Sequence, residues 1–176
     1  MHQLLLLRHA KSSRGDASMA DRDRPLSGRG RAAAASMRQV MLQLGLAPDL
    51  VLVSPARRTL QTLEALEPWE DTPLIEPVEA LYLAHVMTLV QALRSVADTV
   101  RSVLLIGHNP GMHELALALA GERDLASPAH VARGLVAGYP TGALAEFAIA
   151  GPWHQLDKGG GRLMRFLIPR ELDRAC

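Results

Sequence analysis

The sequence predicts an α/β fold in which helices cover both faces of a central, mostly parallel sheet. Three short runs, at residues 3–7, 50–53 and 103–106, have the length of strands and are almost wholly apolar. Continuous apolar runs are typical of strands that are buried on both faces, as in parallel sheets. Each run is followed by polar or turn residues and then by a helical pattern. Strands that alternate with helices in this way predict a three-layer α/β/α arrangement.

The helices are predicted from the spacing of apolar residues and from the residues at their ends. Residues 28–44 form an alanine-rich stretch with apolar side chains at helical spacing. Ser27 can cap its start, and Gly45 lies just past its end. Further helices are expected at residues 56–66, 86–97 and 112–120, and irregular chain at residues 68–77 and 124–142.

Two late strands are predicted at residues 143–149 and 162–168, with Pro152 and the glycines at 159–161 between them. Glycine triplets also occur in phosphate-binding loops. This one lacks the spacing and the Lys-Ser/Thr pair of a P-loop. We therefore expect a plain turn between the two strands.

The composition limits the classes of function. A chain of 176 residues with 48% hydrophobic residues can bury a core, and we expect one domain over residues 1–176. A net charge of +1 and an aromatic content of 3% argue against nucleic acid as a partner. Cys176 is the only cysteine, so neither a disulfide nor a cysteine-based zinc site can form within the chain. No apolar stretch reaches membrane length and no signal peptide is recognisable, so we expect a cytoplasmic protein without a membrane partner.

Polar clusters follow each of the three apolar runs. The first run ends at Arg8-His9, the second is followed by Ser54 and the pair at 57–58, and the third by His108-Asn109. Open α/β sheets bind ligands at the carboxyl ends of their strands. We therefore expect two histidines and several arginines to meet at one edge of the sheet.

Arginine and histidine without clustered carboxylates suit phosphoryl chemistry. Guanidinium groups bind phosphate oxygens in pairs and stay charged. A neutral imidazole can attack phosphorus and carry the phosphoryl group as a covalent intermediate. Nearby arginines should lower the pKa of such a histidine, and a second histidine can donate to the phosphoryl oxygens. Because arginines can neutralise the phosphate, we expect neither a metal nor a cofactor.

These motifs resemble a known family. LLLLRHAKS, SPARRTLQT and LLIGHNPG, in this order, look like the histidine phosphatase superfamily, which is also called phosphoglycerate mutase-like. DRDRPLSGRGR at 21–31 and YPTGALAEF at 139–147 are similar to the small phosphohistidine phosphatases of the SixA type. The resemblance runs from Leu4 to about Phe147 and implies a phosphoglycerate mutase-like fold.

The resemblance also implies roles for individual residues. His9 would be the nucleophile that becomes phosphorylated, and Arg8 would bind the transferred phosphoryl group. The family pattern Ser-Pro-x-x-Arg-x-x-Gln-Thr selects Arg58 rather than Arg57 as the second arginine. His108 would complete the pocket. Water would then hydrolyse the phosphohistidine and release inorganic phosphate.

Other assignments stay open on sequence alone. Lys11 and Ser12 follow the nucleophile, and we count them among the residues that bind substrate, with a solvated loop as the alternative. Arg24 and Arg57 are either secondary phosphate ligands or structural residues. Glu79 is the nearest match to the general acid of larger family members, or else a surface glutamate.

The substrate is predicted in the same way. A phosphohistidine-bearing protein is the leading candidate, because an imidazole leaving group demands less of a proton donor than an alkoxide. A small phosphate ester or sugar phosphate is the alternative if an acid such as Glu79 reaches the leaving oxygen. A non-catalytic phosphate-binding module would not require His9. We expect the protein to act as a monomer.

Overall fold

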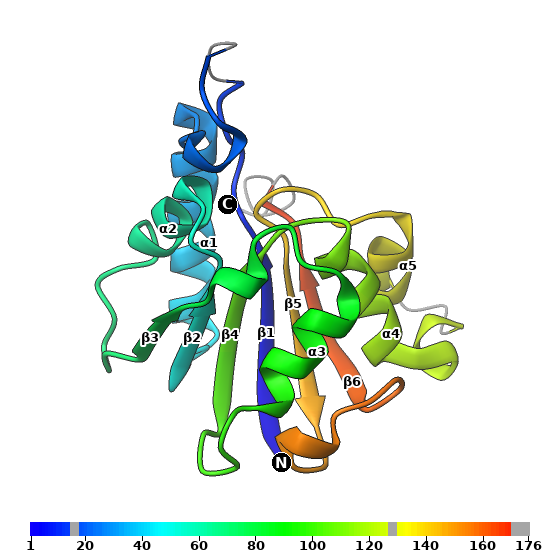
Figure 1. Cartoon of the computed structure of the whole chain (residues 1–176). Helices are drawn as coiled ribbons and strands as arrows, with labels where there is room; N and C mark the ends of the chain where they lie inside the picture. The colour runs from blue at the N-terminus through cyan, green and yellow to red at the C-terminus, as the bar shows by residue number, and fades with distance from the viewer. Residues whose placement is uncertain (15–17, 127–129, 170–176) are drawn as a thin grey trace.

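The fold centres on a six-stranded mixed sheet, shown in Figure 1. The computed structural model describes residues 1–14, 18–126 and 130–169. The strand order is β3-β2-β4-β1-β5-β6. The first four strands in this order are parallel to one another, β5 is antiparallel to β1, and β6 is antiparallel to β5. The strands are β1 (His2–Arg8), β2 (Leu50–Val53), β3 (Leu74–Pro77), β4 (Ser102–Gly107), β5 (Leu144–Ile149) and β6 (Gly161–Leu167).

Helices cover both faces of the sheet. The α-helices are α1 (Gly28–Gln43), α2 (Arg57–Glu64), α3 (Val86–Arg94), α4 (Gly111–Leu125) and α5 (His130–Ala137). Three short 3₁₀ turns lie in the connections, namely η1 (Asp21–Asp23) before α1, η2 (Glu79–Leu81) before α3 and η3 (Trp153–Gln155) between β5 and β6. Figure 1 shows α1 and α2 on one face and α3, α4 and α5 on the other. The predicted three-layer α/β fold with a mostly parallel sheet is confirmed.

The leucine run of β1 explains why its sequence is continuously apolar. Leu4 and Leu6 pack with residues of α3, α4 and α5, whereas Leu5 and Leu7 pack with Met37 of α1 and its neighbours. Successive side chains of a strand point to opposite faces, so a strand between two helical layers needs apolar residues at every position.

The ends of α1 are also as predicted. The Ser27 hydroxyl accepts a hydrogen bond from the Gly30 amide at 3.1 Å, and Gly45 takes a φ of +63° just past the end. Among the described residues, no helix is long and apolar enough to cross a membrane. The glycine triplet contributes to a turn at 158–159, and its last member, Gly161, begins β6.

Two segments predicted as irregular contain regular structure. Residues 68–77 include β3, an edge strand whose first residue, Leu74, is 62% exposed, so the strand leaves little apolar pattern in the sequence. Residues 124–142 include α5, whose sequence contains Gly134. A Cβ at Gly134 would lie 3.2 Å from the Phe166 ring, so this helical glycine permits close packing rather than a break.

Candidate active site

The two histidines of the predicted site directly follow the ends of the neighbouring strands β1 and β4. Arg8 at the end of β1 pairs with Gly107 at the end of β4. The next residues, His9 and His108, therefore lie side by side, with ring centroids 5.3 Å apart. Parallel pairing in register thus brings together two histidines that are far apart in the sequence.

The second arginine comes from the helix after β2. Arg58 lies in the first turn of α2 and is only 3% exposed. Its Nη2 is 3.3 Å from Nδ1 of His108. Three segments that follow β1, β2 and β4 therefore meet at the carboxyl edge of the sheet, as we predicted from the sequence.

These groups line a cavity of about 360 Å³. Since one water molecule occupies ~30 Å³ in the liquid, the cavity has room for a tetrahedral oxyanion and part of the molecule that carries it. Its lining residues are Arg8, His9, Lys11, Ser12, Arg14, Arg24, Arg58, Leu83, His108, Asn109 and Thr141.

The His9 ring is held with one nitrogen fixed. His9 is buried, and its Nδ1 lies 2.7 Å from the carbonyl oxygen of Ala10. A carbonyl only accepts, so Nδ1 carries the proton and Nε2 keeps its lone pair. Burial, followed by the charges of Arg58 and Arg8, lowers the pKa of His9 to about 4. The ring is therefore neutral at physiological pH and keeps a free lone pair on Nε2.

His108 is neutral for similar reasons. Burial, followed by the neighbouring His9 and Arg58, lowers its pKa to about 3. Its Nε2 is 2.7 Å from the Ser54 hydroxyl. The Tyr82 ring contacts the His108 ring edge-on, with ring centroids 5.6 Å apart. Both ring nitrogens of His108 thus have protein partners.

Arg8 presents a buried donor without a partner. Its Nη1 donates to the Tyr139 carbonyl at 2.9 Å, and Asn109 Nδ2 donates to the same oxygen at 2.9 Å. The Nε of Arg8 is buried and makes no hydrogen bond within the described part of the chain. Burial also lowers the pKa of Arg8. An unpaired buried donor is costly.

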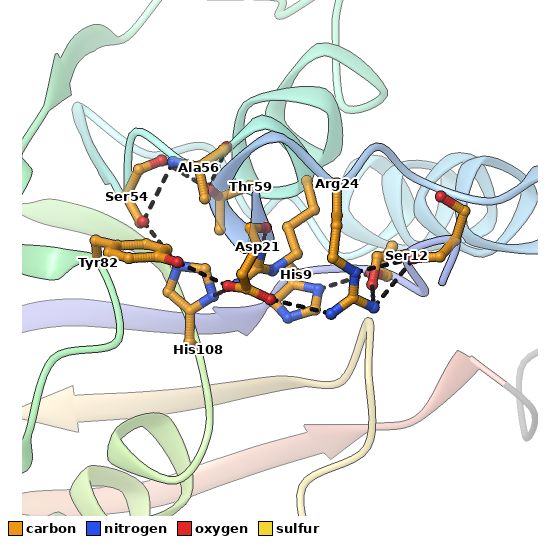
Figure 2. Close-up of polar contacts among 12 residues, drawn as sticks. His9, Ser12, Asp21, Arg24, Ser54, Ala56, Thr59, Tyr82 and His108 are labelled. Carbon is orange, nitrogen blue, oxygen red and sulfur yellow. Dashed lines mark hydrogen bonds and ion pairs between the residues drawn. The ribbon is translucent and has the colours of Figure 1, made fainter. Parts of the chain in front are cut away.

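Asp21 organises one wall of the site (Figure 2). Its carboxylate accepts hydrogen bonds from Arg58 Nη2 at 3.0 Å, from Arg24 Nη1 at 3.0 Å and from the Tyr82 hydroxyl at 2.7 Å. Arg58 Nη1 also donates to the Asp21 carbonyl at 2.6 Å. The Tyr82 hydroxyl, followed by the Arg58 charge and the Arg24 contact, lowers the pKa of Asp21 to about 2. Asp21 therefore remains ionised and fixes the Arg58 guanidinium.

The sequence reasoning did not select Asp21, Tyr82 or Ser54. Asp21 opens the DRDRPLSGRGR motif and Ser54 opens SPARRTLQT, so both carried a signal through the resemblance. Tyr82 lies outside the quoted motifs. It reaches the site because η2 brings it beside His108 and Asp21.

The loop after β1 is fixed by close packing on α1. A Cβ at Gly30 would lie 2.0 Å from the carbonyl oxygen of Lys11, so only glycine fits there. The same oxygen accepts hydrogen bonds from the amide and the hydroxyl of Ser27, at 2.8 and 3.0 Å. The start of α1 thereby fixes the backbone two residues beyond His9.

The open assignments fall into two groups. Lys11 and Ser12 line the cavity, as does Arg24, which also donates to the Ser12 hydroxyl at 3.1 Å. Arg57 is exposed and does not line it. Glu79 also lies outside the lining, where its 74% exposed side chain pairs with Arg22 at 2.6 Å.

A metal site of familiar type is not evident. Within residues 1–14, 18–126 and 130–169, no three His, Cys, Asp or Glu side chains are grouped to hold an ion. The charge in the cavity is instead carried by guanidinium groups and a lysine. Such a set of donors binds anions.

Comparison with known proteins points to one family. The model of the histidine phosphatase superfamily (branch 1) matches residues 4–80. An uncharacterized protein of Mycobacterium tuberculosis is 36% identical over 165 residues, which cover 93% of this chain and all of that protein. An uncharacterized chloroplastic protein of Arabidopsis thaliana is 31% identical and covers 95% of this chain and 78% of its own.

Solved structures agree with the sequence matches. The putative phosphohistidine phosphatase SixA from Agrobacterium tumefaciens has a TM-score of 0.80 and 31% identity, covering 96% of this chain and 98% of its own. The putative SixA from Nakamurella multipartita has a TM-score of 0.82 and 28% identity, with 96% of each chain covered. A protein histidine phosphatase SixA complexed with tungstate has a TM-score of 0.75 and 25% identity, and the match covers 97% of this chain and 99% of that structure's chain. This chain therefore belongs to the histidine phosphatase superfamily and resembles its SixA phosphatases, as its motifs predicted.

Proposed function

We propose that this protein is a metal-independent phosphatase that works through a phosphohistidine intermediate on His9 and acts on protein phosphohistidine. One observation carries the proposal. The free Nε2 lone pair of a neutral His9 lies in a cavity that is also lined by Arg8, Arg58 and His108. This arrangement combines a nucleophile with donors for the phosphoryl oxygens.

The first step transfers the phosphoryl group to the protein. Nε2 of His9 attacks phosphorus while the bond from phosphorus to the leaving group breaks. The hydrogen bond from Nδ1 to the Ala10 carbonyl stabilises the positive charge that the ring acquires. Arg8 and Arg58 neutralise the phosphoryl oxygens, which is the role that a metal ion has in other phosphatases.

The second step restores the enzyme. Water attacks phosphorus, the bond between phosphorus and Nε2 breaks, and inorganic phosphate leaves. The low pKa of His9 favours this cleavage, since its ring departs as a neutral base.

The absence of a strong acid from the described cavity lining favours phosphohistidine as substrate. The lining contains no carboxyl group, Asp21 has a pKa of about 2, and Glu79 lies outside it. An alkoxide leaving group needs a proton donor, whereas the imidazole of phosphohistidine needs less help to depart. The tungstate-bound relative is a protein histidine phosphatase, which supports the same choice.

The test is a comparison of kcat/KM among a phosphohistidine peptide, a phosphoserine peptide of the same sequence and a generic aryl phosphate, with and without EDTA. We expect chelator-resistant turnover that strongly favours the phosphohistidine peptide. Rapid quenching should trap an acid-labile phosphoryl group on the protein. Preference for the aryl or serine ester would show that the substrate is a phosphate ester and not phosphohistidine. Loss of turnover in EDTA would contradict metal independence.

Replacement of the nucleophile separates catalysis from binding. In His9→Ala, we expect turnover to fall by ~10⁴-fold or more, as when nucleophiles are removed from other enzymes, and the trapped phosphoenzyme to vanish. His154→Gln is a matched control, because His154 is exposed in η3 and pairs with Asp98. Retention of hydrolysis by His9→Ala would refute the proposed mechanism.

A further inference from the structure

His108 is engaged at both ring nitrogens in a way that fixes its proton. Nδ1 lies 3.3 Å from Arg58 Nη2, and Nε2 lies 2.7 Å from the Ser54 hydroxyl (Figure 2). A guanidinium has only donors, so Nδ1 must be the acceptor. A neutral imidazole carries one N–H, which is therefore on Nε2 and donates to Ser54. In this arrangement, His108 has no N–H left to donate to an anion.

The groups around the ring also favour its neutral form when an anion is bound. His108 faces His9 and Arg8 from β1 and its end, Arg58 from α2, the Tyr82 ring from η2 and the more distant Asp21 from η1. Burial, the adjoining His9 and the two arginines all lower its pKa, and only Asp21 opposes them. The other cations that line the cavity are Lys11, Arg14 and Arg24. Even a dianion is outnumbered by these cations, so nothing calls for a further positive charge on the ring.

Ser54 is the partner that allows the proton to change place. It is fully buried at the end of β2, and its carbonyl accepts a hydrogen bond from Thr59 Oγ1 at 2.7 Å. A hydroxyl both donates and accepts, whereas a carbonyl or an amide N–H would lock His108 in one tautomer. A serine at this point therefore supports either form of the ring.

We propose that His108 changes tautomer when a phosphoryl group binds, and that Ser54 is the positioning residue that stabilises both forms. One proton leaves Nε2 for water and one is taken up from water at Nδ1, so the ring stays neutral. The Ser54 hydroxyl turns from acceptor to donor towards Nε2. Nδ1–H then donates to a phosphoryl oxygen, and the Nη2–H of Arg58 that Nδ1 had accepted becomes available to the same anion. The inference rests on the proposed function for the place of the oxyanion.

The test reads the protonation of His108 directly. Long-range ¹H–¹⁵N spectra of the labelled protein distinguish the two tautomers from the doubly protonated ring, and His108→Gln assigns the signals. Inorganic sulfate serves as a dianion that is not hydrolysed. We expect the Nε2–H form in the free protein and the Nδ1–H form when sulfate is bound. An unchanged Nε2–H form, or a ring protonated on both nitrogens, would overturn the proposal.

The same sample separates this inference from the proposed function. Active protein whose His108 tautomer does not change on binding sulfate contradicts the tautomer change alone. Protein that changes tautomer but does not hydrolyse the phosphohistidine peptide contradicts the phosphatase proposal alone.

A pair of serine variants tests the role of Ser54. Ser54→Ala should bind sulfate about tenfold more weakly, the equivalent of one neutral hydrogen bond, and should reduce the shift to the Nδ1–H form. Ser102→Ala is the matched control, since Ser102 is also buried and hydrogen-bonded, to Gln3 at 2.8 Å, at the opposite end of the sheet. Equal sulfate affinity and an equal tautomer change in the two variants would overturn the role of Ser54.

Discussion

The polar side chains at the two ends of the sheet differ in whether they have hydrogen-bond partners within the protein. At the amino end, the carboxylates of Asp98 and Asp49 both have partners in the chain. Asp98 accepts from the Trp153 amide at 2.8 Å and lies 3.2 Å from His154, and Asp49 accepts from the amides of Arg101 and Ser102 at 2.8 and 2.9 Å. These contacts join loops to the sheet.

At the carboxyl end, donors and lone pairs remain unused. The Arg8 Nε has no partner in the described part of the chain, and Nε2 of His9 keeps its lone pair. Several cations line the cavity, and Asp21 is the carboxylate that holds two of them. Buried groups that are left unsatisfied cost stability. The carboxyl end therefore gathers cationic donors and a free lone pair that suit an anion, whereas Asp98 and Asp49 at the amino end join loops to the sheet.

Apart from loss of the nucleophile, the largest effect is expected from Arg58, the second of two adjacent arginines in α2. Arg58→Ala removes a buried cation from the cavity, and we expect kcat/KM for the phosphohistidine peptide to fall by ~10²–10³-fold, as when an oxyanion donor is lost. Arg57→Ala should stay within about twofold, because Arg57 is exposed and outside the lining. Steady-state kinetics of the two variants checks this, and similar losses in both would remove Arg58 from the site.

The site residues that could be predicted from the sequence are those that end or directly follow regular strands. Arg8, His9 and His108 follow buried parallel strands, whose apolar runs are visible in the sequence and whose carboxyl ends must meet. Arg58 was selected by its motif. Asp21 and Tyr82 arrive on 3₁₀ turns, and no periodicity in the sequence encodes the path of such turns. Glu79 was a candidate by order along the chain, but its turn directs it to Arg22.

The fold follows the same division. Strands β1, β2 and β4 were predictable because burial on both faces demands apolar residues at every position. The edge strand β3 has one exposed face and an exposed leucine, so its four residues resemble a loop. Helix α5 contains Gly134, which packs closely against Phe166. Tertiary contacts decided both cases, and a single sequence does not display them.

The next effect is on stability and has a definite sign. The pKa of His9 is about 4 in the folded protein, below its ordinary value of 6.5. As the pH falls from 6.5 to 4, the unfolded chain takes up a proton that folded His9 does not, so stability is lost across this window. The slope from one such group is ~1.4 kcal/mol per pH unit.

Denaturant unfolding at several pH values checks this slope. We expect the free energy of unfolding to fall less steeply between pH 6.5 and 4 in His9→Gln than in the parent protein. His108, with its pKa of about 3, adds to the slope in the parent protein, and removal of His9 takes away one cause of that low pKa, so the contribution of His108 falls in the variant as well. Identical slopes would mean that His9 takes up its proton at the same pH in the folded and the unfolded protein.

A smaller effect should come from the carboxylate that holds Arg58. Asp21→Asn keeps the size of the side chain but removes the charge, and a hydrogen bond between charged groups is worth ~1.5–3 kcal/mol. We expect kcat/KM to fall by ~10–100-fold, mainly through KM, as Arg58 loses its fixed orientation. Asp23→Asn is the matched control in the same turn, because Asp23 is exposed and the hydrogen bonds of Arg58 go to Asp21 and His108. Equal kinetics in the two variants would show that Arg58 is held without Asp21.

The smallest expected effect tests the amino end of the sheet. Asp98→Ala removes the acceptor of the Trp153 amide and the partner of His154, and we expect a loss of ~1 kcal/mol in stability. For a chain of this size, that loss lowers Tm by roughly 2–4 °C. The activity should stay within about twofold, since Asp98 lies at the opposite end of the sheet from His9. A large fall in kcat/KM without a fall in Tm would show that the two ends of the sheet are coupled. It would contradict the assignment of stability to the amino end and of activity to the carboxyl end.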